Sequence, residues 1–278
     1  MKNYSTAPLP FVGQKRNFIK VFKQELVKKE APKIYIDLFG GSGLLSRVAK
    51  DVHPTSKVIY NDYDNYRERL NSITKTNAIL NDLRPLVAHI QQKTKIDIST
   101  KEKIIKRIAK ETGFVDYITL SSSLLFSMKY VLSLEQLKKE TLYNRIRKSP
   151  IPLAEDYLKG LEVVSLDYKM LFEQYKNYDS VVYLIDPPYL STDCSTYASD
   201  NYWKLKDYLD VLKVLHNQNY FYFTSNKSSI IELCKWIGDN TGAVNPFDKA
   251  KIKTHFTTMN QTSSYTDMML FKWNQTTT

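Results

Sequence analysis

A strand, a glycine-rich turn, a helix and a second strand follow one another near the N-terminus and define the architecture open to this chain. The apolar run 34–39 predicts a buried strand, and Gly40-Gly41-Ser42-Gly43 follows it directly. The pattern then predicts a helix over 44–51 and a strand over 58–60. Two strands joined through a helix imply a parallel sheet with a right-handed crossover. We therefore expect an α/β fold built on a parallel sheet.

Helices and strands alternate again after residue 160. The segments expected there are strands 162–166, 181–185 and 221–224 and helices 168–175, 202–217 and 229–238. Residues 251–256 and 268–273 can pair, so the sheet is expected to be mostly parallel with an antiparallel C-terminal hairpin. Two helices are expected to present one apolar side, namely 17–29 with Phe18, Val21, Phe22, Leu26 and Val27, and 202–217 with Leu205, Leu209, Leu212 and Leu215.

The middle of the chain is basic and helical in pattern. The whole chain has 40 Lys and Arg against 29 Asp and Glu, a net charge of +11. Residues 75–150 hold 15 of the basic and 7 of the acidic residues, so +8 lies in this segment. The Ser-Pro-Ile-Pro stretch 149–152 predicts a linker at its end. This charge favours a surface for a polyanion, and a solvated helical face is the alternative.

Ligands of an open parallel sheet bind beyond the carboxyl ends of its strands, so the residues at those ends are the candidates for chemistry. The first such segment runs from Asp37 through Phe39 to the glycines Gly41 and Gly43. Glycines allow the backbone to approach a ligand closely, and the amides at the start of the following helix favour an anion. An ordinary turn is the alternative. A nucleoside-triphosphate loop is disfavoured, because no Gly-Lys-Ser/Thr follows.

Asp62 ends the second strand, 19 residues beyond Gly43. An acidic side chain at this spacing can accept hydrogen bonds from the hydroxyls of a ribose, although Asp62 alone could equally be a helix N-cap. Together with the glycine turn it points to an adenosine-bearing cofactor, either a dinucleotide or S-adenosylmethionine. Asp167 has two similar interpretations, one near the adenine of such a cofactor and one as the N-cap of helix 168–175.

The third candidate segment is Asp186-Pro187-Pro188-Tyr189, which follows the most apolar strand of the chain. Two prolines restrict the backbone, so the Asp186 carboxylate and the Pro187 carbonyl can face one small volume. Two acceptors aimed together suit an exocyclic amine, which has two N–H hydrogens. The Tyr189 ring offers a platform for a flat base, and such stacking contributes ~1–3 kcal/mol. A purely structural proline turn is the alternative.

Asp-Pro-Pro-Tyr preceded by Phe39-Gly40-Gly41-Ser42-Gly43 resembles the S-adenosylmethionine-dependent DNA adenine-N6 methyltransferases of the Dam-like (D12) family. Residues 10–15, Pro-Phe-Val-Gly-Gln-Lys, are similar to the opening aromatic-x-Gly-x-Lys motif of that family. The resemblance implies a Rossmann-like methyltransferase sheet with a helical insert. It also implies an S-adenosylmethionine-binding catalytic domain, residues 1–66 and 160–278, and a basic target-recognition insert, residues 67–159.

The resemblance also implies roles for individual residues. Cofactor binding would fall to Phe11, Gly13, Lys15, Asp37, Phe39, Gly41, Gly43, Asp62 and Asp186, and catalysis to Asp186, Pro187 and Tyr189. The implied activity is that of a site-specific DNA methyltransferase, which moves a methyl group from S-adenosylmethionine to N6 of a flipped-out adenine in double-stranded DNA. The expected location is the cytoplasm, in a bacterium, in a phage-infected cell or in association with the nucleoid.

The insert departs from the family pattern. It lacks the family's Asn-Gly stretch and its Gly-x-Phe-Asn-x-Pro-Phe-Gly-like hairpin, so the resemblance implies no recognition sequence. Alternatives are an enzyme of the same fold that acts on RNA adenine, cytosine N4 or protein glutamine, and an inactive nucleic-acid-binding module. Asp186 favours adenine in DNA, because glutamine and many RNA enzymes resemble Asn-Pro-Pro-Tyr and cytosine-N4 enzymes Ser-Pro-Pro-Tyr.

Neither a membrane segment nor a metal site is expected. The strongest apolar run, 181–185, falls far short of the roughly 18 residues that a spanning helix needs. The N-terminus shows no apolar signal segment. Cys194, Cys234 and four scattered histidines make no zinc pattern. The sequence indicates no obligatory protein partner.

Overall fold

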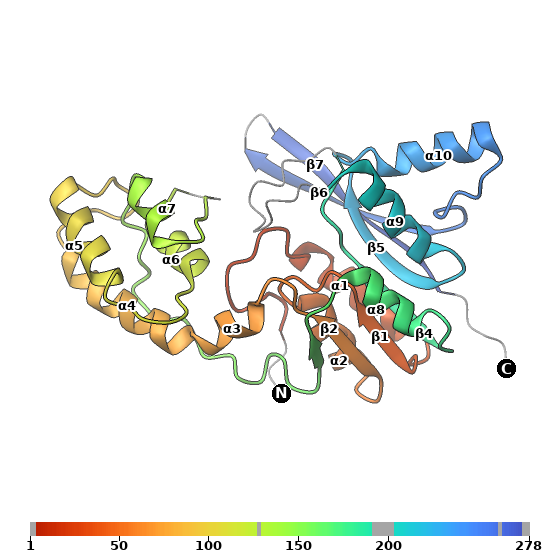
Figure 1. The fold of residues 1–278 in the computed structure, drawn as a ribbon, viewed down its shortest axis with the longest axis horizontal. Coiled ribbons are helices and arrows are strands. Elements are labelled where there is room, and N and C mark those ends of the chain that lie inside the picture. Colours follow the sequence, from red (N-terminus) through yellow and green to blue (C-terminus); the bar gives the residue numbers. More distant parts are fainter. Residues whose placement is uncertain (1–3, 127–128, 191–202, 261–262, 274–278) are drawn as a thin grey trace. The chain divides into compact units, whose positions relative to one another are not determined.

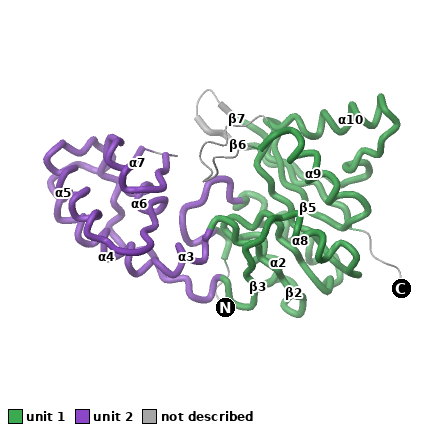
Figure 2. Tube along the Cα trace, in the orientation of Figure 1, with its two compact units in different colours: residues 1–6, 15–64, 158–278 green, residues 7–14, 65–157 purple. Residues whose placement is uncertain are grey.

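The computed structural model describes residues 4–126, 129–190, 203–260 and 263–273, and the chain divides into two compact units. Unit 1 comprises residues 1–6, 15–64 and 158–278, and unit 2 comprises residues 7–14 and 65–157 (Figure 2). Residues 7–14 therefore lie in unit 2, although the sequence analysis placed them with the α/β domain. No helix in the described part of the chain is both long and apolar enough to span a membrane.

Unit 1 contains a seven-stranded sheet of order β3-β2-β1-β4-β5-β7-β6 (Figure 1). Its strands are β1 (Ile34–Asp37), β2 (Lys57–Asn61), β3 (Glu162–Val164), β4 (Val181–Ile185), β5 (Asn219–Ser225), β6 (Lys251–Asn260) and β7 (Ser263–Lys272). The first five strands pair in parallel, whereas β7 runs antiparallel to both β5 and β6. The predicted fold class, a mostly parallel sheet with an antiparallel C-terminal hairpin, is confirmed.

The two central strands are buried along their whole length. Every residue of β1 and of β4 is buried, as expected for parallel strands covered on both faces. Alternate residues point to opposite sides, so Tyr35 packs with Phe22 and Val48 in one cluster and Ile36 packs with Leu171 in the other.

Helices cover both faces of this sheet. One cluster takes in α1 (Ile19–Val27), which continues the 3-10 turn η1 (Arg16–Phe18), and α2 (Leu44–Val52). The other cluster takes in α8 (Tyr168–Tyr175), α9 (Leu205–Leu215) and α10 (Ile230–Thr241). This arrangement buries both faces of a parallel sheet and leaves the ends of its strands for a site.

The buried faces of two helices differ from the expectation. Leu205 of α9 is 51% exposed, and the buried residues are Tyr208, Val211, Val214 and Leu215. Burial of the Tyr208 ring removes more apolar surface from water than burial of Leu205, so α9 is rotated toward Tyr208. In α1, Val27 is 70% exposed because it ends the helix, while Ile19, Phe22 and Leu26 form the buried stripe.

Unit 2 is helical in the part that the structure describes. Its helices are α3 (Tyr66–Asn71), α4 (Ile73–Leu86), α5 (Ile98–Ile108), α6 (Tyr117–Leu124) and α7 (Leu134–Lys139). Asp97, Asp116 and Ser133 cap α5, α6 and α7, and each side chain accepts a backbone N–H from within the first turn. A single pair of residues, Lys95 and Tyr143, forms an isolated antiparallel bridge.

The Ser-Pro-Ile-Pro stretch is packed onto unit 2. Ile151 is buried, and its backbone N–H donates to Asn77 Oδ1 at 2.8 Å while its carbonyl accepts from Asn77 Nδ2 at 2.9 Å. A side-chain amide that satisfies both groups of one residue fixes the path of the backbone. These residues therefore form an anchored segment within unit 2, which continues to Tyr157, where the sequence predicted a linker.

Candidate active site

The site lies where the strand order reverses. β1 pairs with β2 on one side and with β4 on the other, so the connections lead away in opposite directions from this point. Asp37 ends β1, and Asp186 directly follows β4. The two strands are in register with Asp37 opposite Leu184, and Leu38 N–H donates to the Leu184 carbonyl at 3.1 Å. A ligand crevice is expected at exactly this kind of position in an open α/β sheet.

The glycine turn is held flat against Tyr60, near the end of β2. A Cβ on Gly40 would lie 2.3 Å from the Tyr60 ring, so only glycine fits there. Gly43 has φ 71° and is the N-cap of α2, and Gly41 also has a positive φ of 48°. The Tyr60 hydroxyl lies 2.7 Å from the Gly41 carbonyl oxygen and 3.1 Å from Asp62 Oδ1. One buried phenol therefore links the turn to the next predicted site residue.

Asp62 is buried at the end of β2, with 5% of its surface exposed. The N-cap of α3 is Asn65, so the interpretation of Asp62 as a helix cap is wrong. Asp167, in contrast, does cap a helix. Its side chain accepts the Lys169 N–H at 2.7 Å and caps α8, which favours the structural interpretation of that residue.

Asp37 is completely buried at the carboxyl end of β1. Ser46 Oγ donates to its Oδ2 at 2.6 Å, whereas Oδ1 has no hydrogen-bond partner within the described residues. Burial raises the pKa of the Asp37 carboxyl to about 7; the negative charge of Asp186 adds to this rise and the Ser46 hydroxyl opposes it. A buried acceptor without a partner at a strand end indicates a place for a ligand donor.

Asp186 forms an ion pair with Lys15. Lys15 Nζ lies 2.7 Å from Asp186 Oδ2, and the two side chains are 8% and 18% exposed. Burial raises the pKa of Asp186, the Lys15 ammonium lowers it, and the charge of Asp267 raises it. Lys15 Nζ also lies 5.3 Å from the centre of the Tyr189 ring. The structure thus brings three predicted residues, Lys15, Asp186 and Tyr189, into one corner.

This corner carries more negative than positive charge. The charge of Asp267 raises the pKa of Asp186, and the charge of Asp186 raises the pKa of Asp37. Lys15, which pairs with Asp186, is the cation beside these carboxylates. Asp267 lies on β7, opposite Ser225 at the end of β5. Asp267 was not among the predicted site residues. The pair Thr266-Asp267 is similar to the D12 pattern but was given no role, and the structure places Asp267 within β7 rather than before it. A cation is the ligand that such a surplus of carboxylates favours.

Tyr208 of α9 supports the proline turn. Its hydroxyl donates to the Tyr189 carbonyl at 3.3 Å, and Pro187 beside Asp186 is buried. Burial raises the pKa of the Tyr189 phenol, so this ring stays neutral. The turn that carries Asp186 is therefore fixed from both the sheet side and the helix side.

Phe39 lies in an aromatic cluster with Tyr168 and Trp203. The ring centres of Phe39 and Tyr168 are 4.9 Å apart, and Trp203 lies 5.9 Å from Tyr168 at an interplanar angle of 22°. Neither Tyr168 nor Trp203 was a predicted site residue, because no local pattern distinguishes them from other aromatic residues. The cluster provides flat apolar surface beside the glycine turn.

Phe11 and Gly13 belong to unit 2. The Phe11 ring meets Tyr66 edge-on at 5.9 Å, and Gly13 has φ 80°. Their role in cofactor binding stays a prediction. Residues 191–202, which include Cys194, lie outside the described residues.

Two comparisons with known proteins agree on the kind of protein that the chain is similar to. A family model described as D12 class N6 adenine-specific DNA methyltransferase matches residues 11–231. A protein of Haemophilus influenzae (strain ATCC 51907 / DSM 11121 / KW20 / Rd), named "Putative methyltransferase", is 36% identical over 285 residues. That match covers 98% of this chain and 94% of the relative. The family match spans the glycine turn, Asp62 and the Asp186 turn.

Proposed function

Because this chain belongs to the D12 class N6 adenine-specific DNA methyltransferase family, we propose that it transfers a methyl group from S-adenosylmethionine to N6 of an adenine in double-stranded DNA. The observation that carries the proposal is the Asp186 corner at the switch point of the sheet. There a carboxylate already accepts a nitrogen-bound proton, from Lys15 at 2.7 Å, beside the ring of Tyr189. An adenine amine offers the same kind of donor.

The residues at the strand ends fit S-adenosylmethionine, which when bound supplies an electrophilic methyl group on a positively charged sulfur. The cofactor's ammonium group can donate to Asp37 Oδ1, which has no hydrogen-bond partner within the described residues. Asp62 can accept from the ribose hydroxyls, and the amides at the start of α2 suit the carboxylate of the cofactor. The surplus of carboxylates around Asp186 suits its positive charge. Phe11, Gly13 and Lys15 are proposed to complete this site.

Asp186 and Pro187 act on the amine. The N6 lone pair of adenine is delocalised into the ring, so the free amine is a poor nucleophile. Hydrogen bonds from its two N–H groups to the Asp186 carboxylate and the Pro187 carbonyl favour the pyramidal nitrogen that develops as the new N–C bond forms. With the cofactor bound, formation of this N–C bond would break the bond between sulfur and the methyl carbon, and S-adenosylhomocysteine, neutral at sulfur, would leave. The nitrogen would then carry a positive charge, which the carboxylate stabilises, and would return to neutrality by releasing one proton to solvent.

The target base must leave the duplex, because N6 cannot be reached inside it. Tyr189 is proposed to stack on the extruded base. The basic residues of unit 2 are proposed to bind the phosphates, which position the duplex without reading its sequence.

Three lysines of unit 2 are the best candidates for phosphate contacts. Lys103, Lys106 and Lys110 lie on or just after α5, are exposed, and make no ion pair within the described residues. Neutralising all three with glutamine is expected to weaken duplex binding at low salt. The slope of log affinity against log salt concentration should become shallower by up to about 2.7, because each phosphate contact contributes roughly 0.9 to its magnitude. Fluorescence anisotropy over a salt series measures this slope.

A matched control replaces three lysines of unit 1 that are ion-paired, Lys169, Lys176 and Lys213. The change in net charge is the same, and the slope should stay close to that of the unmodified protein. Equal slopes for the two triple variants would show that the basic face of α5 is simply a solvated helix surface.

The proposed function is tested by supplying the purified protein with tritium-labelled S-adenosylmethionine and, separately, duplex DNA, single-stranded DNA, RNA and protein. We expect label in duplex DNA, recovered after digestion as N6-methyladenine. Label in RNA, in N4-methylcytosine or in glutamine would show that the enzyme methylates a different planar amine. No transfer to any acceptor, together with retained DNA binding, would identify an inactive binding module.

A further inference from the structure

The side chain of Asn61, the last residue of β2, ties three neighbouring strands of unit 1 together at their carboxyl ends. Its Nδ2 donates to the Leu38 carbonyl, just beyond β1, at 3.0 Å and to the Leu166 carbonyl, just beyond β3, at 2.9 Å. Its Oδ1 accepts the Leu166 N–H at 2.9 Å. Asn61 is 2% exposed, so these bonds are shielded from water. The amide therefore fixes the ends of β1, β2 and β3 relative to one another.

Asn61 acts on a ligand only through the segments that it holds. An amide side chain has two N–H donors, and the Leu38 and Leu166 carbonyls take both. Leu38 leads into the glycine turn, and Asp62 directly follows Asn61. The Asp62 N–H in turn donates to the Val164 carbonyl at 2.7 Å. A change at this amide therefore reaches the glycine turn and Asp62 together.

Tyr60, the preceding residue, holds the same strand end from the opposite face of the sheet. Its buried hydroxyl lies 2.7 Å from the Gly41 carbonyl oxygen and 3.1 Å from Asp62 Oδ1. Both are acceptors and a phenol has one proton, so it donates to one at a time, and the shorter distance favours Gly41. A Cβ on Gly40 would lie 2.7 Å from the Asn61 carbonyl oxygen. The glycine turn thus rests on both residues.

The two side chains set the separation between the glycine turn and Asp62. These segments are the ones proposed to meet the carboxylate and the ribose of S-adenosylmethionine, and a ligand that spans both binds best when they are already correctly placed. We propose that Tyr60 and Asn61 are positioning residues for the cofactor, which hold Asp62 and the glycine turn at the separation that the cofactor spans. This inference rests on the proposed function.

A purely structural role of the two residues would have a different signature. Loss of a buried hydrogen bond would then lower the free energy of unfolding, and the protein that remains folded would bind the cofactor normally. A positioning role predicts weaker cofactor binding by the folded protein. It also predicts a higher KM for S-adenosylmethionine with little change in kcat at saturating cofactor, because the lost interaction is made equally in the ground state and the transition state.

Tyr60→Phe is the first test, because it removes one hydroxyl and keeps the ring against the glycine turn. We expect S-adenosylhomocysteine to bind roughly fivefold to tenfold more weakly in calorimetry, the effect of one hydrogen bond. The KM for S-adenosylmethionine should rise by a similar factor. Tyr220→Phe is the matched control, since the hydroxyl of this buried tyrosine of β5 donates to the Pro246 carbonyl at 3.0 Å. Its affinity should equal that of the wild-type protein.

A modified ligand shows whether Asp62 is the group that moves. S-(2′-deoxyadenosyl)homocysteine lacks one of the ribose hydroxyls proposed to donate to Asp62, so the wild-type protein should bind it several-fold more weakly than S-adenosylhomocysteine. In Tyr60→Phe the same deletion should cost less, because the contact is already weakened and the two losses are not additive. Additive losses, or wild-type affinity in a folded Tyr60→Phe protein, would overturn the inference.

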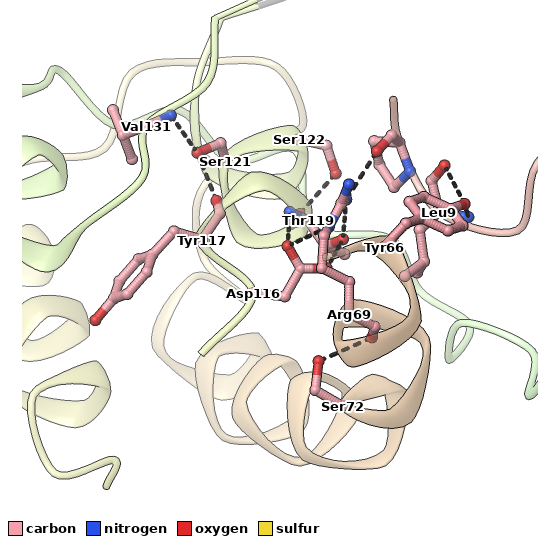
Figure 3. Close-up of polar contacts among 11 residues, drawn as sticks. Leu9, Tyr66, Arg69, Ser72, Asp116, Tyr117, Thr119, Ser121, Ser122 and Val131 are labelled. Atoms are coloured by element: carbon pink, nitrogen blue, oxygen red, sulfur yellow. Dashed lines mark hydrogen bonds and ion pairs between the residues drawn. The ribbon is translucent and has the colours of Figure 1, made fainter. Parts of the chain in front are cut away.

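Asn61→Ala removes all three hydrogen bonds and should weaken binding of S-adenosylhomocysteine further. Its matched control is Ser121→Ala in unit 2, because the Ser121 side chain also joins two backbone segments. Its Oγ donates to the Tyr117 carbonyl at 2.7 Å and accepts the Val131 N–H at 3.0 Å (Figure 3). The control should lower the free energy of unfolding and leave the affinity unchanged. If Asn61→Ala does not fold, Tyr60→Phe decides the inference by itself.

Amide hydrogen exchange provides a readout that needs neither ligand nor methyl transfer. Tyr60→Phe should speed exchange at Gly43, whose N–H donates to the Gly40 carbonyl at 2.7 Å within the glycine turn, and Tyr220→Phe should not. Unchanged exchange at Gly43 in Tyr60→Phe would show that the hydroxyl does not hold the turn. Absence of methyl transfer by the wild-type protein would instead contradict the proposed function, and the exchange and binding results would still decide the positioning role.

Discussion

An Asp186→Ala variant is expected to lose methyl transfer by roughly 10³-fold when cofactor and duplex DNA are saturating. Removal of one preorganised electrostatic partner of a transition state costs ~10²–10³ in rate, and Asp186 is proposed both to bind the amine and to balance its developing charge. Tritium transfer into duplex DNA under single-turnover conditions measures the step itself. Transfer at a near-normal rate would refute the role assigned to Asp186.

Two further variants separate chemistry from folding. Asp186→Ala also takes from Lys15 its ion-pair partner at 2.7 Å, and breaking a buried pair destabilises a protein by roughly 3–5 kcal/mol. Lys15→Met combined with Asp186→Ala should recover part of this stability without recovering activity. Asp210→Ala is the matched control, because it removes a carboxylate of unit 1 that is paired with two exposed lysines, Lys169 and Lys213. Its transfer rate should be normal.

Asp37→Asn is expected to stabilise the protein at alkaline pH. Burial raises the pKa of Asp37 from its ordinary value of 3.8 to about 7, so the folded chain binds more protons than the unfolded chain between these values. Stability therefore falls as pH rises through this window and stays low above pH 7. At about 1.4 kcal/mol for each unit, the substitution should add on the order of 2–4 kcal/mol at pH 8 and little at pH 4.

Urea unfolding at pH 4 and pH 8 measures this difference. Asparagine keeps an oxygen that can accept from Ser46 Oγ, so the hydrogen bond at 2.6 Å does not confound the comparison. Equal destabilisation at both pH values would contradict the raised pKa of Asp37.

The same substitution should weaken cofactor binding. An ammonium group of the ligand pairs with the ionised carboxylate, so the affinity of the wild-type protein for S-adenosylhomocysteine should rise as pH increases through about 7. Binding at pH 7 should release about half a proton, detectable by calorimetry in buffers of different ionisation enthalpy. Asp37→Asn should abolish both effects. Replacing a carboxylate that destabilises the fold but binds a ligand commonly increases stability and weakens binding.

Much of unit 1 could be predicted because its elements are encoded locally. The bounds of β4, Val181–Ile185, and of α8, Tyr168–Tyr175, agree with the prediction residue for residue. Both have a clear apolar pattern that ends at a polar or turn residue. The face of α9 was predicted in part: Leu215 is buried and Leu212 packs against the core, but Leu205 is exposed and Tyr208 is buried. A stripe of leucines does not reveal that the Tyr208 hydroxyl donates to the Tyr189 carbonyl. The resemblance to the D12 family is confirmed.

Some residues of the candidate site could be predicted from the local sequence and others could not. Asp37, Asp62 and Asp186 each end or follow a strand and could be recognised individually. Tyr60 could not, because its hydroxyl donates to Gly41 in the glycine turn, a contact that forms only in the folded chain. The pair Thr266-Asp267 is similar to the D12 pattern, but the place of Asp267 beside Asp186 depends on the pairing of β5 with β7. Lys15 was expected to contact the cofactor, and its ion pair with Asp186 is visible only in the folded chain.

Periodicity, prolines and glycines act over a few residues, and they determined the order of strands and helices, the glycine turn and the proline-braced Asp186. Contacts between distant segments depend on how the elements pack, which no short window of residues specifies. Packing therefore decided the place of residues 7–14 in unit 2, the two hydrogen bonds of Tyr66 to Leu9, and the ammonium of Lys15 on Asp186.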